Sequence, residues 1–241
     1  MLKNLEGQRI PDVTFHTRVD DQWKDVTTND VFANKKVVVF ALPGAFTPTC
    51  SSSHLPRYNE LADAFTSRGI DAIVCVAVND AFVMNEWARV EDAEHITFLP
   101  DGNGEFTQKM GMLVDNKRNL GFGQRSWRYS MLVDNGTITK MFIEPEVDGD
   151  PYDVSDADTM LRYVDPKAKA PADVLLFTKP GCAFCTKAKK LLDEHSLAYD
   201  EVASSPRSLR AVSGKSTTPQ VFIDGKYVGG AEALEGYLAK M

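Results

Sequence analysis

One short segment divides this sequence into two unequal parts. Residues 165–173 spell D-P-K-A-K-A-P-A-D, which includes two prolines and no large apolar side chain. A segment of this composition adds nothing to a hydrophobic core, and its prolines favour a semi-rigid, extended linker. The length of 241 residues is also long for one ordinary domain. We therefore expect two domains, at 1–165 and 172–241, joined by a linker at 166–171.

Composition and charge argue against several classes of function. Hydrophobic residues make up 43% of the chain and charged residues 25%, as in globular proteins with a packed core. The net charge of −7 divides into −8 for residues 1–171 and +1 for 172–241, so no general affinity for nucleic acid is expected. The N-terminus lacks the apolar segment of a secretory signal, and no stretch approaches the roughly 20 apolar residues that span a bilayer. We expect a cytoplasmic protein with no membrane partner.

The first part mixes strand and helix patterns. Short apolar, β-branched runs at 37–42 and 70–78 are typical of buried strands. Asn135-Gly136 lies between two further strand-like runs and favours a tight hairpin turn. Apolar residues at helical spacing follow Cys50, namely Leu55, Tyr58, Leu61 and Phe65. The fold class of this part is therefore α/β or α+β.

A Cys-x-x-Cys motif opens the second part. The strand-like run at 174–177 leads through Lys-Pro-Gly into Cys182-Ala183-Phe184-Cys185, where a helical pattern begins. Unpaired N–H groups and the dipole at a helix N-terminus favour a thiolate, and nearby lysines add positive potential. Cys182 is therefore the expected nucleophile and Cys185 the inner thiol. Half of a zinc site is the alternative, but it needs two further Cys or His ligands at suitable spacing.

Two more motifs follow in the second part. Thr218-Pro219 precedes a strand, where a proline loses no ladder bond and can be cis. Gly229-Gly230 precedes the last helical pattern, whose N-terminus can hold a carboxylate. With Lys-Pro-x-Cys-x-x-Cys, Thr-Pro-Gln-Val-Phe-Ile and Gly-Gly in this order, residues 172–241 resemble the glutaredoxins, which have a thioredoxin fold.

This resemblance implies a glutathione site. Cys182 would exchange with a glutathione disulfide, Lys179 would lie near the glycyl carboxylate, and the Thr218 backbone beside Pro219 would pair with the ligand. The γ-glutamyl end would meet Gly230, Ala231 and Glu232. Two positions depart from the family pattern, because Ala183-Phe184 stands where Pro-Tyr or Pro-Phe is common and Glu232 stands where Asp is usual. Both departures bear on redox potential and glutathione affinity.

A lone cysteine ends a similar loop in the first part. Residues 43–50 spell P-G-A-F-T-P-T-C between a strand pattern and a helix pattern. The helix start favours a thiolate at Cys50, the Thr47 hydroxyl can donate to that thiolate or to a bound oxygen, and the two prolines fix the loop. The alternative is a buried structural cysteine, with Thr47 or Thr49 as the helix cap.

The longer run P-G-A-F-T-P-T-C-S-S-S-H-L-P, with V-N-D-A-F-V-M at 78–84, resembles the type 5 peroxiredoxins, and the likeness extends to about residue 165. It implies a second thioredoxin-like domain, so the whole chain is expected to be α/β with two thioredoxin-fold domains. It also implies that Cys50 attacks a peroxide and becomes a sulfenic acid. Thr47 would orient the peroxide, and Pro43 would limit access.

The same family places an arginine beside the thiolate. Its Arg-x-Ser-Met motif matches Arg128-Tyr129-Ser130-Met131, so the resemblance assigns this role to Arg128. A guanidinium there would favour the Cys50 thiolate and would hold a peroxide oxygen by its fixed donors. Arg125, three residues earlier, competes for the role, and a surface strand position for Arg128 is the structural alternative.

The sequence indicates that oxidised Cys50 is reduced by a thiol from outside the first part of the chain. Cys75 lies in the middle of a strand pattern, which is typical of a small buried hydrophobe, and residues 144–158 contain no cysteine. We expect a glutathione-dependent peroxidase for hydrogen peroxide and alkyl hydroperoxides, in which glutathione caps Cys50 and Cys182 removes the glutathionyl group. Glutathione is then a co-substrate, and no metal or tightly bound cofactor is expected.

Two other functions stay open at this point: a general glutathione-linked protein-disulfide reductase, and a non-catalytic redox-sensing or holdase module. The expected partners are peroxides, glutathione, glutathione reductase acting indirectly, and further copies of the chain in a dimer or tetramer. The sequence specifies neither the preferred peroxide nor the part played by Cys185. It also leaves open whether Cys182 serves its own chain or a neighbour.

Overall fold

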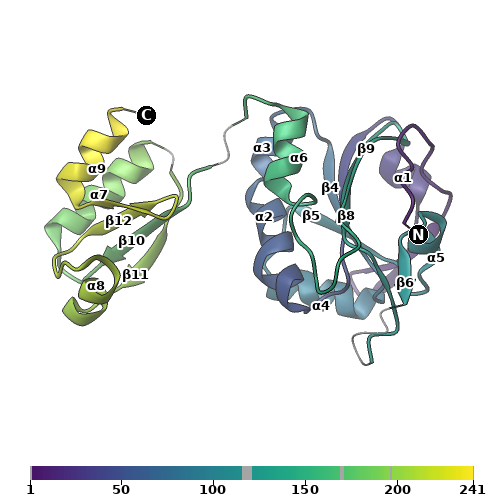
Figure 1. Cartoon of the computed structure of the whole chain (residues 1–241), viewed down its shortest axis with the longest axis horizontal. Helices are drawn as coiled ribbons and strands as arrows, with labels where there is room; N and C mark the ends of the chain where they lie inside the picture. Colours follow the sequence, from purple (N-terminus) through teal and green to yellow (C-terminus); the bar gives the residue numbers. More distant parts are fainter. Residues whose placement is uncertain (1, 116–120, 169–170, 196, 241) are drawn as a thin grey trace. The chain divides into compact units, whose positions relative to one another are not determined.

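The computed structural model describes residues 2–115, 121–168, 171–195 and 197–240, and the chain divides into two compact units. Unit 1 is Met1–Ala170 and unit 2 is Pro171–Met241. The division lies within the expected linker at 166–171, of which residues 169–170 are outside the described part. Each unit has its own main sheet (Figure 1). Among the described residues, the buried apolar side chains form two core clusters in unit 1 and one in unit 2.

Unit 1 is built on a five-stranded sheet in the order β5-β4-β3-β8-β9. The three parallel strands are β3 (Lys36–Ala41), β4 (Ala72–Ala77) and β5 (Ile96–Pro100). Two antiparallel strands complete the sheet, β8 (Tyr129–Asp134) and β9 (Thr137–Ile143). Asn135 and Gly136 join them with φ angles of 44° and 73°, which confirms the predicted tight turn.

After Lys36, every residue of the central strand β3 is apolar and buried, because both faces of the sheet are covered. Val38 and Phe40 pack in one core and Val37 and Val39 in the other, as the two-residue period of a strand requires. Figure 1 shows α2, α3 and α6 together on one face, with α1 and α5 on the other. These helices span α1 (Thr28–Phe32), α2 (Leu55–Glu60), α3 (Ala62–Thr66), α5 (Glu105–Lys109) and α6 (Ala157–Val164).

The helical region after Cys50 differs from the single helix that its spacing predicts. It begins with a π-helical turn, η1 (Cys50–His54), and continues as α2 and α3. Leu61 separates these two helices, with φ −88° and ψ 6°. The predicted apolar residues still pack in one core, because three- and four-residue steps keep them on one side of the segment.

Two hairpins and helix α4 complete the described part of unit 1. The strands form two hairpins, β1 (Thr14–Val19) with β2 (Gln22–Thr27) and β6 (Leu113–Asp115) with β7 (Gln124–Ser126). Helix α4 (Ala81–Val90) begins after Asp80, whose carboxylate accepts hydrogen bonds from the first N–H groups of the helix. Among the described residues, no helix is both long and apolar enough to cross a membrane.

Unit 2 has a four-stranded sheet in the order β11-β10-β12-β13. The strands are β10 (Val174–Thr178), β11 (Asp200–Ala203), β12 (Gln220–Ile223) and β13 (Lys226–Gly229). Its helices are α7 (Ala183–Glu194), α8 (Pro206–Ser213) and α9 (Ala231–Leu238), and α7 and α9 lie side by side on one face of the sheet (Figure 1). Both units combine a sheet with helices, so the predicted α/β class is confirmed.

The sequence analysis did not predict two elements of unit 2, β11 and α8. Every residue of β11 is exposed, so this strand lacks the alternation of buried and exposed residues that identifies a half-buried strand. Helix α8 is short and buries a single residue, Leu209. Pairing with β10 defines β11, and a capping box at Ser205 opens α8.

Candidate active sites

Cys50 is fully buried at the start of the helical segment that follows β3. It follows a loop of eight residues after Ala41, and the Ser51 N–H donates to the Thr47 carbonyl at 3.0 Å as the helical segment begins. The loop is fixed by Asn79, whose Oδ1 accepts the Ala45 N–H at 3.0 Å. A Cβ at Gly44 would lie 3.3 Å from that same oxygen, which explains the glycine.

Arg128 brings a permanent positive charge to Cys50. Its Nη1 lies 3.6 Å from the Cys50 sulfur, and the side chain is only 1% exposed. The sheet register accounts for this contact, because Ala41 pairs with Tyr129 and the start of β8 therefore meets the end of β3. The competing arginine, Arg125, donates instead to the Val78 carbonyl.

His54 is a site residue that the sequence analysis missed. Burial and the neighbouring Arg128 charge lower its pKa well below 6.5, so the ring is neutral. Its Nε2 lies 3.2 Å from the Ser155 carbonyl and its Nδ1 lies 3.0 Å from Arg128 Nη1. A carbonyl only accepts and a guanidinium only donates, so the proton of the neutral ring is on Nε2. The sequence feature that could have identified His54 is its position, one helical turn after Cys50.

The segment after β9 contacts Arg128 through two side chains. Asp150 forms an ion pair with Arg128 Nη2, and the Arg128 Cζ lies 5.7 Å from the centre of the Tyr152 ring. The buried Glu144 carboxylate holds the segment, since its Oε1 accepts three backbone N–H groups and one hydroxyl; the donors are Asp153 N, Val154 N, Ser155 N and Ser155 Oγ. The sequence analysis had treated this segment only as one without cysteine.

The other expected residues of the first site lie close by. Pro43 is half-buried just beyond β3. The Thr47 hydroxyl donates to the Gly44 carbonyl at 2.8 Å, so its proton is directed away from Cys50 rather than toward it. Cys75 is fully buried in β4, where burial raises its thiol pKa well above the ordinary value and favours the neutral form.

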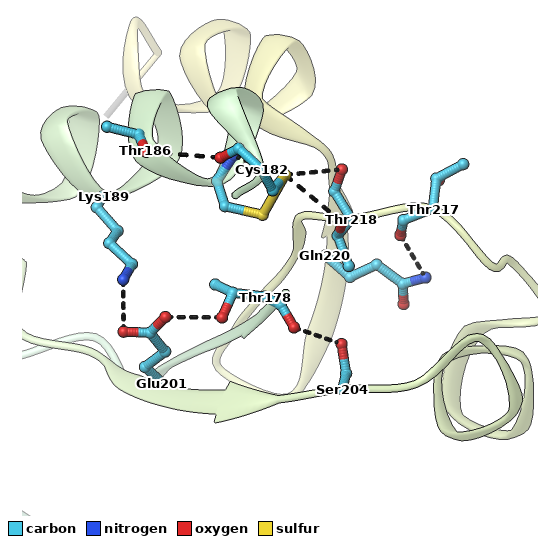
Figure 2. Close-up of a disulfide and its surroundings, with 10 residues drawn as sticks. Thr178, Cys182, Thr186, Lys189, Glu201, Ser204, Thr217, Thr218 and Gln220 are labelled. Carbon is cyan, nitrogen blue, oxygen red and sulfur yellow. Dashed lines mark hydrogen bonds and ion pairs between the residues drawn. A yellow bond between two sulfur atoms is a disulfide. The ribbon is translucent and has the colours of Figure 1, made fainter. Parts of the chain in front are cut away.

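Cys182 and Cys185 form a disulfide at the start of α7 (Figure 2). Cys182 is the N-cap residue, and its sulfur accepts the Cys185 N–H at 3.2 Å. Cys182 is half-buried whereas Cys185 is 3% exposed, so the first sulfur is the accessible one. The Thr218 hydroxyl donates to the Cys182 sulfur at 3.5 Å, as Figure 2 shows.

Several of the expected glutathione-site residues gather near Cys182. The Thr218–Pro219 peptide bond is cis, and the Thr218 carbonyl oxygen lies 3.7 Å from the Cys182 sulfur. A Cβ on Gly230 would lie 3.6 Å from the Pro219 carbonyl oxygen, so the N-terminus of α9 adjoins this loop. Two more of the residues lie in the first turn of α9, the buried Ala231 and the exposed Glu232.

Two lysines of α7 form ion pairs with glutamates, so they add less positive potential near Cys182 than the sequence predicts. Lys187 pairs with Glu235 and Lys189 with Glu201, each at 2.6 Å. Figure 2 shows the second pair, in which Glu201 also accepts the Thr178 hydroxyl. Lys179, beyond the end of β10, is exposed. Within the described ranges, no group of three or more His, Cys, Asp or Glu residues is arranged to hold a metal ion.

Comparison with known proteins assigns each unit to a family. The Redoxin family model matches residues 5–161, and the Glutaredoxin model matches residues 174–228. The chain is 58% identical over 242 residues to the hybrid peroxiredoxin hyPrx5 of Haemophilus influenzae, in a match covering 99% of this chain and 100% of the relative. Peroxiredoxin sll1621 of Synechocystis is 56% identical over 173 residues, covering 66% of this chain and 91% of the relative.

Solved structures agree with the first assignment. The crystal structure of reduced Prx3 from Vibrio vulnificus in complex with H₂O₂ is 40% identical and matches with a TM-score of 0.64, covering 68% of this chain and 100% of that one. Redoxin and glutaredoxin domains both have the thioredoxin fold, so the expected pair of thioredoxin-fold domains is confirmed. The chain belongs to the peroxiredoxins, a family of peroxidases, and is a hybrid member in which a glutaredoxin domain follows the Redoxin domain.

Proposed function

We propose that this chain reduces hydrogen peroxide and alkyl hydroperoxides with glutathione as the electron donor. The observation that carries the proposal is the Arg128 guanidinium, 3.6 Å from the buried Cys50 sulfur, in a chain that also holds an accessible Cys182. Residues 1–165 form the peroxidase domain in this proposal, 166–171 the linker and 172–241 the reducing domain. Binding of H₂O₂ by the Vibrio vulnificus relative supports the substrate class.

The first step takes place at Cys50. Its thiolate attacks one peroxide oxygen, an S–O bond forms as the O–O bond breaks, and the departing oxygen takes a proton and leaves as water or an alcohol. Arg128 stabilises the thiolate and the charge that develops on the departing oxygen. Because the Thr47 hydroxyl donates to Gly44, its oxygen is left to accept the O–H of the peroxide. Pro43 limits access to the loop.

Glutathione then returns Cys50 to its reduced form. Its thiol displaces water from the sulfenic acid, giving a mixed disulfide on Cys50. The Cys182 thiolate attacks the glutathione sulfur of that disulfide, which releases the Cys50 thiolate and leaves glutathione on Cys182. A second glutathione attacks there, so one peroxide and two glutathione molecules become water or alcohol, water and glutathione disulfide. Glutathione reductase regenerates the donor, so it is an indirect partner.

The glutathione moiety is held in unit 2 during this exchange. We assign its glycyl carboxylate to Lys179, its backbone to Thr218 beside Pro219, and its γ-glutamyl end to the start of α9, comprising Gly230, Ala231 and Glu232. The position of Thr218 against the Cys182 sulfur supports this assignment. Cys185 offers a second route, because its attack on glutathionylated Cys182 releases glutathione and yields the disulfide seen in the structure. Two glutathione molecules then reduce this disulfide and leave as glutathione disulfide.

A reducing environment suits this cycle. Glutathione keeps the thiols of cytoplasmic proteins reduced, so we place the enzyme in the cytoplasm. No tightly bound cofactor takes part in any of these steps. We also propose a dimer or tetramer, as the peroxiredoxin resemblance implies, and its mass in solution is measurable by light scattering during gel filtration.

Peroxide consumption coupled to glutathione, glutathione reductase and NADPH tests the proposal. We expect Cys50→Ser to abolish turnover, Cys182→Ser to slow it at least tenfold, and Cys75→Ser to leave it close to wild type. The second variant would turn over by glutathione alone, since thiol exchange needs no protein thiol in principle. Full activity of Cys50→Ser would refute the peroxidase assignment. Reduction of unrelated mixed disulfides without peroxide turnover would favour the general disulfide reductase instead.

A further inference from the structure

The guanidinium of Arg128 is held from two opposite sides. On one side Nη1 contacts both the Cys50 sulfur, at 3.6 Å, and His54 Nδ1, at 3.0 Å. On the other side Nη2 bonds to a carboxylate oxygen of Asp150. A guanidinium is planar and its donors have fixed directions, so contacts at both ends determine the orientation of the whole group.

The His54 ring is held by several contacts. It lies 5.0 Å from both the Phe40 ring and the Tyr152 ring, measured between centroids, and its Nε2 bonds to the Ser155 carbonyl. Tyr152, Ser155 and Asp150 all belong to the segment after β9, which is tied to Arg128 at its start. The Glu144 N–H donates to the Arg128 carbonyl at 3.1 Å, while the Glu144 carboxylate gathers the N–H groups of 153–155.

We propose that Asp150 is a positioning residue for Arg128, which fixes the guanidinium so that Nη1 faces the Cys50 sulfur. Within the described part of the structure, the Nε of Arg128 is buried without a hydrogen-bond partner. No hydrogen bond at that nitrogen therefore opposes a rotation of the guanidinium. The ion pair at Nη2 supplies the missing restraint. The inference rests on the proposed role of Cys50 as the thiol that reacts with peroxide.

The negative charge of Asp150 also acts directly on Cys50. It disfavours the thiolate, whereas the positioning of Arg128 favours it. Asp150 is 41% exposed, so water screens its charge toward Cys50, whereas the bond to Nη2 acts through contact. We therefore expect the geometric effect to exceed the direct one. Removing the carboxylate then makes Cys50 less reactive, although simple charge counting predicts a more reactive thiolate.

The test compares Asp150→Asn, Asp150→Glu and Asp153→Asn in the full-length chain. Asp153 is the matched control, since it lies in the same segment and supplies its backbone N–H to Glu144. Two measurements are made for each protein. The first is the pH midpoint for alkylation of Cys50 by iodoacetamide, followed by mass spectrometry of the peptide that contains it. The second is the rate of oxidation by H₂O₂ in a single turnover, followed by tryptophan fluorescence.

We expect Asp150→Asn to raise the alkylation midpoint and to slow oxidation near neutral pH by about tenfold, as a misplaced catalytic group does. Asp150→Glu should recover part of both, and Asp153→Asn should match wild type. An unchanged or lowered midpoint in Asp150→Asn would overturn the inference. If wild-type Cys50 is alkylated but not oxidised, the proposed peroxidase function fails, whereas the alkylation midpoints still decide the role of Asp150.

Discussion

Three segments that are far apart in the sequence contribute single side chains to the surroundings of Cys50. His54 comes from η1, Arg128 from the start of β8, and Asp150 from the segment after β9. Arg128 is charged and His54 is neutral, although both are buried, because a guanidinium keeps its proton where an imidazole loses it. The only permanent cation among these three side chains is therefore the one that touches the sulfur.

The neutral state of His54 predicts how the free energy of unfolding depends on pH. Its pKa in the folded chain lies below 6.5, so below pH 6.5 the unfolded chain binds a proton that the folded chain does not. Folding stability contributed by His54 is thus complete above pH 6.5 and is lost as the pH falls, by up to about 1.4 kcal/mol for each pH unit. His54→Gln has no such titration, so its free energy of unfolding should approach that of wild type in acid.

Urea unfolding at about pH 7.5 and pH 5.5 measures this difference. All three tryptophans lie in the first 165 residues, so their fluorescence follows unit 1. His95→Gln is the control, because this residue is exposed and only its backbone N–H has a described role, in a bond to Asn59. An equal gap between wild type and His54→Gln at both pH values would contradict a neutral, buried His54.

At the level of secondary-structure elements, close packing between the end of β13 and helix α9 shapes the second site. Gly229 ends β13 with a φ of 134°, a conformation that L-residues rarely adopt, and a Cβ there would lie 2.6 Å from the Ala233 Cβ. The glycine thus lets α9 begin directly beside the Pro219 loop. Its neighbour Gly230 is the N-cap residue of α9.

We predict that Gly229→Ala destabilises unit 2 by about 1–3 kcal/mol, since it adds both backbone strain and overpacking. Gly236→Ala is the matched control. It lies inside α9 with nothing within 4 Å of an added Cβ, so it should be neutral or stabilising by up to about 1 kcal/mol. Thermal unfolding followed by circular dichroism measures both. Equal melting temperatures for the two variants would show that contact with α9 does not require the glycine.

For the whole molecule, the chain joins a Redoxin unit to a Glutaredoxin unit through a short segment. About six residues span no more than about 20 Å when fully extended, and the proline content stiffens them further. This length limits which Cys50 a Cys182 can meet, that of its own chain or that of a neighbour in an oligomer. If the linker is too short for Cys182 to reach the Cys50 of its own chain, reduction between chains is the expected route.

Mixing the Cys50→Ser variant, which we expect to be inactive, with the slowed Cys182→Ser variant tests this expectation. The first keeps Cys182 and the second keeps Cys50, so exchange between chains should raise the glutathione-dependent peroxidase activity when they are combined. The mixture should exceed the sum of the separate activities several-fold, measured by NADPH consumption in the coupled assay. A mixture equal to that sum would mean that each Cys182 serves only its own chain.

From the sequence by itself we predicted two units, their α/β class and a cysteine at the start of a helix in each unit. These follow from local patterns: apolar runs, turn residues and cysteines at helix starts depend on neighbours a few positions away. The family resemblance had already favoured Arg128 over Arg125, and the register of β3 and β8 places Arg128 against the Cys50 sulfur. Only the tertiary structure showed that His54 and Asp150 bond to this arginine. Contacts between distant segments leave no periodic signal in a single chain, because packing and strand pairing create them only when the chain folds.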